Sequence, residues 1–392
     1  MRVGFLGIQC ETSNLGLAAL AYAAVHLLDG LSSADAEFVL FSDNSAAEVA
    51  RMKQALGIPG RRILAIPFRH REPRRLLRSA RELAACDVVI DFTGGDSFSD
   101  IYGERRIAKK LFHKELVILG RTPLVLAPQT YGPFRGRRIL PWVKHVLRRA
   151  ELVMSRDSLS AEYLASLVDR EVLVSTDVAV TLPWDTSRYP LPSVAALRVG
   201  FNVSGLLWRG GYTGDNQFGL RTDYRAYCER VVDELLSQGH EVHLVAHVLS
   251  RGDAENEDDV AASRAVREMF PECTIAPPFA SPVDAKSYIS AMDVFVGSRM
   301  HATIASFTTG VPTIPVAYSR KFAGFFENLG YQVLVDLTST GTDQAVEATL
   351  AYVADLDGMK RGVDAGNAIA AQRIEVFTSR MADLIGRDNE GV

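Results

Sequence analysis

The segment VFVGSRMHATIASFTTGVPTIPV, residues Val294 to Val316, gives the strongest indication of the fold in this chain. A short apolar run stops at Gly297, an apolar helix-like stretch continues to Gly310, and a second apolar run follows. This order predicts strand, tight turn, helix, turn and strand, which is a βαβ unit of a parallel sheet. α/β sheets bind ligands at the turn after such a strand. Here that turn contains Ser298, Arg299, Met300 and His301.

The turn has the composition of an anion-binding site. The first turn of a helix offers N–H groups and a positive dipole, and Arg299 adds a fork of donors beside His301. Taken singly, Ser298 is equally well explained as a helix cap, Arg299 as a surface charge and His301 as a structural residue. Because the polar residues fall together on a predicted ligand-binding turn, the functional interpretation is as well supported as the structural one.

Length and composition indicate a soluble protein with more than one domain. The chain has 392 residues, of which 47% are hydrophobic and 23% are charged. That length exceeds one ordinary hydrophobic core. The apolar N-terminus is short and lacks a cleavage site, and no stretch approaches the roughly 20 apolar residues of a membrane span. Four widely spaced cysteines argue against a structural zinc site and predict reduced thiols in a cytoplasmic protein.

Basic residues gather in the N-terminal half, although the net charge of the chain is −4. They form two clusters: Arg61, Arg62, Arg69, Arg71, Arg74, Arg75, Arg78 and Arg81, and Arg135, Arg137, Arg138, Lys144, Arg148 and Arg149. Such clusters are most often solvated helix faces. The alternative is attraction to a phosphate-bearing acceptor or to anionic lipid headgroups, with peripheral contact at the inner face of a membrane. No recognition motif accompanies the charge, which disfavours nucleic acid as a partner.

Two further predicted strands end in polar turns. The stretch TGGDSFSD (Thr93–Asp100) follows one of them, and its Asp96 projects into a crevice or caps the next helix. The stretch PQTYGPF (Pro128–Phe134) follows another. Its Gln129 and Tyr131 offer amide and hydroxyl groups that suit a sugar, while its Pro–Gly pair alone would indicate only a turn.

Two arginines occupy similar positions. Arg156 follows a predicted strand in the stretch SRDS, and Arg209 lies on the long glycine-rich loop SGLLWRGGYTGDNQFG (Ser204–Gly219). Loops of this length in compact domains are usually functional or disordered.

The alternation of strands and helices falls into two halves separated by a proline-rich stretch, 182–197. We therefore expect an α/β protein with two doubly wound, Rossmann-like parallel-sheet domains facing a cleft. The predicted domains are 1–185 and 196–340. The tail, 341–392, is expected to be helical and to pack back on the first domain.

These motifs together resemble the polysaccharide pyruvyl transferase family, over roughly residues 1–335. The matching pieces are GGDSFSD (Gly94–Asp100), PQTYGPF (Pro128–Phe134), SRDSLS (Ser155–Ser160), TDVA (Thr176–Ala179), GFNVSG (Gly200–Gly205) and GSRMHATIAS with GVPTIPVAYSRK (Gly297–Lys321). Family members often carry N-x-G-D near the first strand. This chain has Asn14, Leu15, Gly16 and Leu17 there, so the acid is missing.

The resemblance implies a fold like that of GT-B glycosyltransferases and an activity that needs no cofactor or metal. That activity is transfer of the pyruvyl group of phosphoenolpyruvate onto a sugar of a bacterial-type polysaccharide or glycolipid, as a ketal bridging two hydroxyls. Residues 1–185 would then form the acceptor side and residues 196–340 the donor side. By this resemblance, Arg299 and His301 are donor-site residues. We further expect donor contacts from Ser298, Met300, Arg209 and Arg156, acceptor contacts from Gln129, Tyr131 and Asn14, and proton transfer by His301 and Asp96.

Two alternatives stay open at this point. One is a GT-B glycosyltransferase that uses a nucleotide sugar, which would share the fold and a helix-end phosphate site. The other is a non-catalytic protein that binds a glycan or phosphate on the same scaffold, an interpretation to which the missing acid at Leu17 gives some weight.

Overall fold

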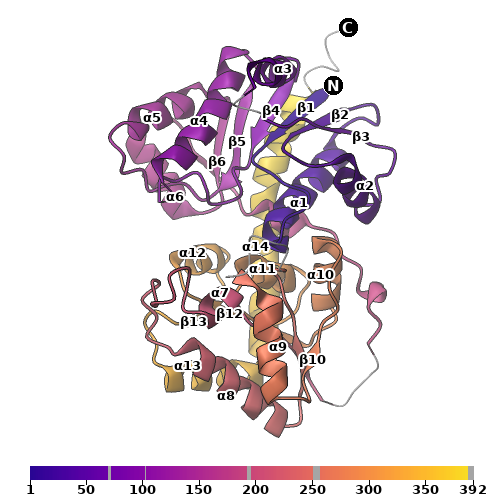
Figure 1. The fold of residues 1–392 in the computed structure, drawn as a ribbon, viewed down its shortest axis with the longest axis vertical. Helices are drawn as coiled ribbons and strands as arrows, with labels where there is room; N and C mark the ends of the chain where they lie inside the picture. The colour runs from indigo at the N-terminus through magenta and orange to yellow at the C-terminus, as the bar shows by residue number, and fades with distance from the viewer. Residues whose placement is uncertain (69–71, 102, 192–195, 250–256, 387–392) are drawn as a thin grey trace. The chain divides into compact units, whose positions relative to one another are not determined.

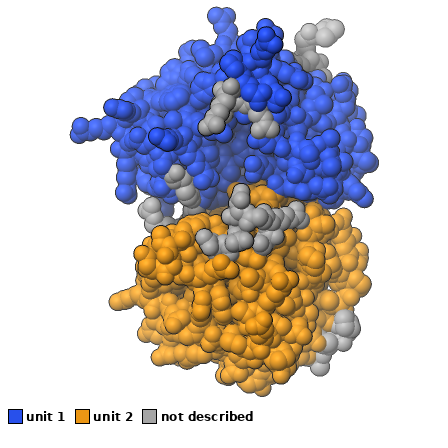
Figure 2. Space-filling model, viewed as in Figure 1, with its two compact units in different colours: residues 1–11, 20–181, 370–392 blue, residues 12–19, 182–369 orange. Residues whose placement is uncertain are grey.

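The computed structural model describes residues 1–392 except 69–71, 102, 192–195, 250–256 and 387–392. The chain divides into two compact units, coloured separately in Figure 2. Unit 1 comprises Met1–Glu11, Leu20–Thr181 and the chain from Ala370 onward, and unit 2 comprises Thr12–Ala19 and Leu182–Ile369. Arg69 and Arg71 of the first basic cluster lie outside the described residues, as does part of the proline-rich stretch.

Unit 1 is built on a parallel sheet with the strand order β3-β2-β1-β4-β5-β6-β7 (Figure 1). Its strands are β1 (Arg2–Leu6), β2 (Glu37–Phe41), β3 (Arg62–Ala65), β4 (Val88–Asp91), β5 (Leu124–Gln129), β6 (Leu152–Ser155) and β7 (Leu173–Val174). The central strands β4 and β5 are buried along their whole length, as expected when helices cover both faces of a parallel sheet. The strand order reverses direction between β1 and β4, which makes their carboxyl ends the switch point where such sheets bind ligands.

Helices connect the strands of unit 1 in the predicted alternation. They are α1 (Leu15–Leu31), α2 (Ala46–Ala55), α3 (Pro73–Ala84), α4 (Glu104–Leu119), α5 (Ile139–Arg149) and α6 (Ser158–Leu167). The apolar faces of α4 and α5 pack on the sheet: Ile107, Leu111 and Val143 are fully buried there. The arginines of α3 and α5 fall mainly on the opposite, exposed faces of these helices.

Unit 2 repeats the same architecture with the order β10-β9-β8-β11-β12-β13. Its strands are β8 (Arg198–Asn202), β9 (Glu241–Leu244), β10 (Thr274–Ile275), β11 (Val294–Gly297), β12 (Thr313–Ala317) and β13 (Val335–Asp336). The predicted βαβ unit is confirmed, since β11, α11 (Met300–Thr308) and β12 follow one another and the two strands pair in parallel. The switch point of this sheet lies between β8 and β11.

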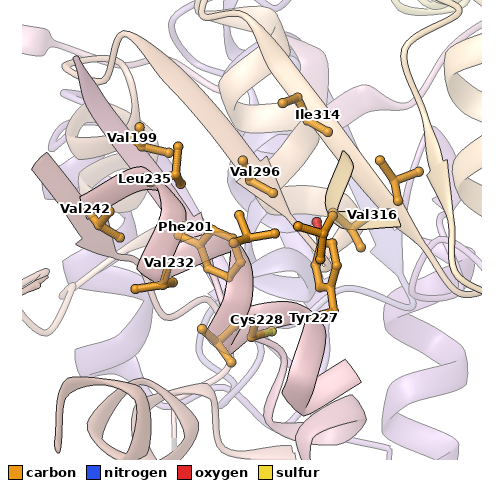
Figure 3. Packing of buried hydrophobic residues seen from close by; sticks show 14 of the residues in the cluster. Val199, Phe201, Tyr227, Cys228, Val232, Leu235, Val242, Val296, Ile314 and Val316 are labelled. Atoms are coloured by element: carbon orange, nitrogen blue, oxygen red, sulfur yellow. The ribbon is translucent and has the colours of Figure 1, made fainter. Parts of the chain in front are cut away.

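The remaining helices enclose the sheet of unit 2. They are α7 (Gly205–Trp208), α8 (Tyr224–Ser237), α9 (Asp259–Met269), α10 (Pro282–Ile289), α12 (Arg320–Asn328), α13 (Thr342–Ala354) and α14 (Leu356–Gly386). Figure 3 shows the core, in which Phe201 and Val296 from the sheet pack near Val232 and Cys228 of α8. All four cysteines of the chain are unpaired and buried, as expected for reduced thiols. The fold class of two doubly wound parallel α/β domains is confirmed.

Two helices belong to both units. Helix α1 begins in unit 2 and continues in unit 1, and α14 does the same. In unit 1, Phe377 of α14 is fully buried and packs edge-on against Phe92. In unit 2, Asn367 Nδ2 of α14 donates to the carbonyl oxygen of Phe307 at 2.7 Å. The predicted boundaries treated 341–392 as one tail, whereas the units divide that segment at Ala370 and transfer Thr12–Ala19 to unit 2. Among the described helices, none is long and apolar enough to cross a membrane.

Candidate active site

The turn between β11 and α11 lies at the switch point of unit 2. Arg299 occupies the N-cap position of α11, and among the described residues no side chain caps this helix. Ser298 is buried, and its hydroxyl accepts a hydrogen bond from the Tyr224 hydroxyl at 2.9 Å. The Tyr224 oxygen in turn accepts from the main-chain N–H of Ser204 at 2.8 Å, after β8. The Ser298 side chain therefore joins the exits of β8 and β11 instead of capping the helix.

Arg299 is buried and held by two acids. Its Nη2 donates to Asp259 Oδ1 at 2.8 Å and to the main-chain oxygen of Glu257 at 2.8 Å. Its Nε donates to Asp259 at 3.1 Å, and its Nη1 to Glu257 Oε2 at 3.2 Å. Burial is the largest single influence and lowers the pKa of this guanidinium, but the charges of Asp259, Tyr318 and Glu257 and the hydrogen bond to Asp259 together outweigh burial and raise the pKa. The two-pronged contact expected with a ligand is thus made with Asp259.

Asp259 forms hydrogen bonds with residues that follow three adjacent strands. Its side chain is fully buried at the start of α9. Its carboxylate accepts main-chain N–H groups from Gly205, after β8, at 2.9 Å, and from His247 and Val248, after β9, at 3.1 and 3.0 Å. With Arg299, after β11, it therefore fixes the exits of β9, β8 and β11 around one carboxylate.

An N-terminal segment docks beside this cluster. The Leu15 N–H donates to the His247 carbonyl oxygen at 3.0 Å, and Asn14 forms an antiparallel bridge with Val248. The Asn14 side chain accepts from the Gly16 N–H at 2.9 Å, at the start of α1. This brings Gly16 against the imidazole of His301, because a Cβ on Gly16 would lie 2.6 Å from His301 Nδ1. Asn14, predicted as an acceptor contact, thus lies in unit 2 with the predicted donor residues Arg209, Ser298, Arg299 and Met300.

His247 is a buried histidine within the same cluster. Burial, and then the charges of His301 and Arg299, lower its pKa to about 3. It is therefore neutral at physiological pH and does not add to the positive charge of Arg299.

Arg209 follows the short helix α7, which begins the predicted glycine-rich loop. It is exposed and lines a pocket of about 440 Å³ within unit 2. Trp208 and Arg225 line the same pocket, with the Arg225 guanidinium 5.3 Å from the centre of the Trp208 ring. This part of the loop adjoins the Arg299 turn through Tyr224, which lines the pocket and bonds Ser298.

In unit 1, the TGGDSFSD stretch forms a tight turn at the end of β4. Gly94 and Gly95 have φ values of 63° and 79°, which glycine adopts without strain. Thr93 also has a positive φ, 41°, and its hydroxyl accepts from the buried Lys114 Nζ at 2.8 Å. Asp96 is partly buried on this turn and accepts a hydrogen bond from the Ser97 hydroxyl at 3.3 Å.

Gln129 and Tyr131 are buried beneath the same turn. Gln129 Nε2 donates to the Asp91 carbonyl oxygen at 3.1 Å, and the Tyr131 hydroxyl donates to the Ala127 carbonyl oxygen at 3.0 Å. Lys114 completes the cluster by pairing with the Asp91 carboxylate at 3.0 Å. These side chains support the turn from inside the unit.

Arg156 is also buried and occupied within unit 1. Its Nη1 pairs with Asp177 at 2.5 Å and its Nε donates to the Thr130 hydroxyl at 2.8 Å.

The predicted site residues fall into two groups, one on each unit. One, on unit 2, contains Asn14, Arg209, Ser298, Arg299, Met300 and His301; the other, on unit 1, contains Asp96, Gln129, Tyr131 and Arg156.

Comparison with known families identifies the chain. The family described as polysaccharide pyruvyl transferase matches residues 14–320, which includes both groups of residues. This chain belongs to the polysaccharide pyruvyl transferase family. The amylovoran biosynthesis protein AmsJ of Erwinia amylovora is 21% identical, over 72% of this chain and 69% of AmsJ.

Solved structures similar to this pyruvyl transferase family member share its fold. HepE of Anabaena, determined with UDP and glucose, superposes with a TM-score of 0.57 at 13% identity, over 99% of this chain and 100% of HepE. A glycosyltransferase from Rickettsia africae gives 0.61 at 8% identity, over 100% and 99% of the two chains. At these identities the similarity establishes the fold, which is that of GT-B glycosyltransferases and related epimerases.

Sequence reasoning missed two residues of this family member's candidate site. Asp259 lies in the acidic run Glu257–Asp259, where any of the three acids could cap the predicted helix. Gly16 could be assigned only to the stretch that resembles N-x-G-D, without a contact to His301. Neither role has a local signal, because each depends on contacts with residues far away in the chain.

Proposed function

We propose that this protein transfers the pyruvyl group of phosphoenolpyruvate onto two hydroxyls of a sugar in a polysaccharide or glycolipid, and releases phosphate. The observation that supports the proposal is the Ser298–His301 turn. It lies at the switch point of unit 2, within the matched family region, and combines a helix N-terminus, a buried arginine and a histidine.

Phosphoenolpyruvate carries a phosphate and a carboxylate, so it needs two cationic or helix-end contacts. We assign one to the start of α11 at Met300. Asp259 and Glu257 already hold the fork of Arg299, so Arg299 contributes by fixing the turn that presents the start of α11. Arg209 is the candidate for the second contact, since it is exposed on the loop that adjoins the turn.

The reaction requires proton transfers but no change of oxidation state. A proton is added to the methylene carbon of phosphoenolpyruvate, and an acceptor hydroxyl bonds to the resulting electrophilic C2 and loses its own proton. A second hydroxyl then bonds to C2 and loses its proton to the departing phosphate, while the bond from C2 to the phosphate oxygen breaks. We assign His301 to proton transfer on the donor and Asp96 to the acceptor hydroxyl. Gln129 and Tyr131 would act on the acceptor through the Asp96 turn that they support.

The test is acceptor-dependent phosphate release. The purified protein is incubated with phosphoenolpyruvate and a panel of pyranosides, and released phosphate and ketal product are measured. His301→Ala should lower the rate by at least about 100-fold, the usual contribution of a proton-transfer group. His145→Ala, an exposed histidine on α5, is the matched control and should leave the rate unchanged.

A nucleotide-sugar glycosyltransferase is the rival function on this fold. It predicts thermal stabilisation by UDP or GDP and none by phosphoenolpyruvate. That result, together with no phosphate release across the panel, would overturn the proposed function. Binding of a glycan without turnover of any donor would instead favour a non-catalytic binding protein.

A further inference from the structure

The segment Thr12–Ala19 is fixed to unit 2 by main-chain contacts. The Leu15 N–H donates to the His247 carbonyl oxygen at 3.0 Å, and the Leu249 N–H donates to the Ser13 carbonyl oxygen at 2.6 Å. These two bonds lie on either side of the Asn14–Val248 bridge and hold the start of α1 on unit 2. The first turn of α1 is therefore set in place relative to the strand exits of unit 2.

Gly16, in that first turn, lies against His301. A Cβ built on Gly16 would lie 2.6 Å from His301 Nδ1 and 2.9 Å from both His301 Cβ and Cγ. Ordinary contacts between such atoms are about 3.5–4 Å. Because the His301 Cβ is among the atoms too close, rotation of the ring alone cannot relieve the overlap. Gly16 is buried, and its helical backbone angles are ones that alanine also adopts. The backbone therefore does not require glycine at this position, whereas the space that His301 occupies does.

We propose that Gly16 is a positioning residue: its missing side chain gives the His301 imidazole its place and orientation, so that the segment Thr12–Ala19 forms part of the active site. The consequence for catalysis rests on the proposed function. Proton transfer by His301 depends on ring orientation, and a misplacement of about 1 Å can lower a rate by about 100-fold. The orientation of the ring itself does not depend on the proposed reaction.

The experiment compares Gly16→Ala with Gly30→Ala. Both positions are in α1, but a Cβ on Gly30 meets nothing within 4 Å. We expect Gly16→Ala to lower kcat for phosphate release by about 100-fold with a smaller change in KM for phosphoenolpyruvate, and Gly30→Ala to change neither. In the same proteins, the imidazole NMR signals of His301, assigned by their loss in His301→Gln, should shift in Gly16→Ala alone.

The two readouts separate the possible failures. If the wild-type protein releases no phosphate, the proposed function fails, and the NMR comparison still decides the role of Gly16. Unchanged His301 signals in folded Gly16→Ala would overturn the inference. If Gly16→Ala does not fold, it is combined with His301→Gly, which removes both the ring and the Cβ that the new methyl group would meet. Recovery of folding in the double variant supports a clash with the His301 side chain, and failure to recover overturns it.

Discussion

At the scale of single residues, the candidate site depends on one buried carboxylate. Asp259 is the main partner of the buried Arg299 and also accepts N–H groups from the loops after β8 and β9. A neutral side chain of the same shape would remove the charge of Asp259 and leave Arg299 in an ion pair with Glu257, whose carboxylate is partly exposed. The carboxylate therefore matters for both charge balance and the geometry of the turn.

Asp259→Asn is predicted to lower the free energy of unfolding by about 3 kcal/mol, because it leaves a buried arginine largely uncompensated. Urea denaturation measures the change. Asp258→Asn is the matched control, since Asp258 is the neighbouring residue and its side chain caps α9 by accepting the Val260 N–H. Asparagine caps helices as well as aspartate, so the control should stay within about 0.5 kcal/mol of wild type. Equal losses in both variants would contradict the role given to Asp259.

Lys110 offers a prediction on pH dependence. Its Nζ donates to the Ser97 carbonyl oxygen on the Asp96 turn at 3.3 Å. Burial, followed by the charges of Lys114 and Arg106, lowers its pKa to about 7, while Asp91 and Asp96 act in the opposite direction. The folded state thus holds this proton less tightly than the unfolded chain. Lys110 therefore lowers the free energy of unfolding by an amount that grows as the pH falls from 10.5, the pKa in the unfolded chain, to about 7, the pKa in the folded protein. Below pH 7 this loss of stability is constant, because Lys110 is protonated in both states.

Lys110→Met removes this titration. The stability of the variant relative to wild type should rise between pH 9 and pH 7 and then level off below pH 7. Lys109→Met, at the exposed neighbouring position on α4, should show no such trend. Urea denaturation at several pH values distinguishes the two, and parallel curves for Lys110→Met and wild type would refute the lowered pKa.

At the scale of elements, the alternation of strands and helices could be predicted because buried parallel strands are continuous apolar runs. The βαβ unit around Gly297 is the clearest example, with β11, α11 and β12 where the pattern placed them. Positions at strand exits could be predicted too, since parallel strands share a carboxyl edge.

The direction and burial of individual side chains could not be predicted in the same way. Gln129 and Tyr131 follow a strand, as a sugar-binding pair would, but they point into the unit and bond Asp91 and Ala127. Arg156 has the position of a ligand-binding residue, yet it pairs with Asp177. An exposed and a buried polar residue look alike in sequence until the partner that compensates the buried one is known.

At the scale of the whole molecule, unit membership does not follow chain order. The sequence predicts one boundary near residue 185, whereas α1 and α14 each begin in unit 2 and continue in unit 1. Both helices contribute buried side chains to unit 1: Ala21 and Leu28 from α1, and Phe377 from α14. A chain cut at the predicted boundary would therefore leave unit 1 without the packing of α14.

The shared helices predict that the two units unfold together. Unfolding of unit 1 would remove the packing of the second halves of α1 and α14, and helices shortened to a few turns are marginal on their own. Their first halves, which hold Gly16 beside His301 and Asn367 beside Phe307, would then fray.

Phe377→Ala tests this coupling. It should lower the free energy of unfolding by about 3–5 kcal/mol because it leaves a cavity in unit 1. Glu375→Ala, at an exposed position on the same helix, should change the free energy of unfolding little. Hydrogen exchange in Phe377→Ala should therefore show faster opening of α11 in unit 2 as well as of β4 in unit 1. Faster exchange confined to unit 1 would show instead that each unit keeps its fold independently of the helices they share.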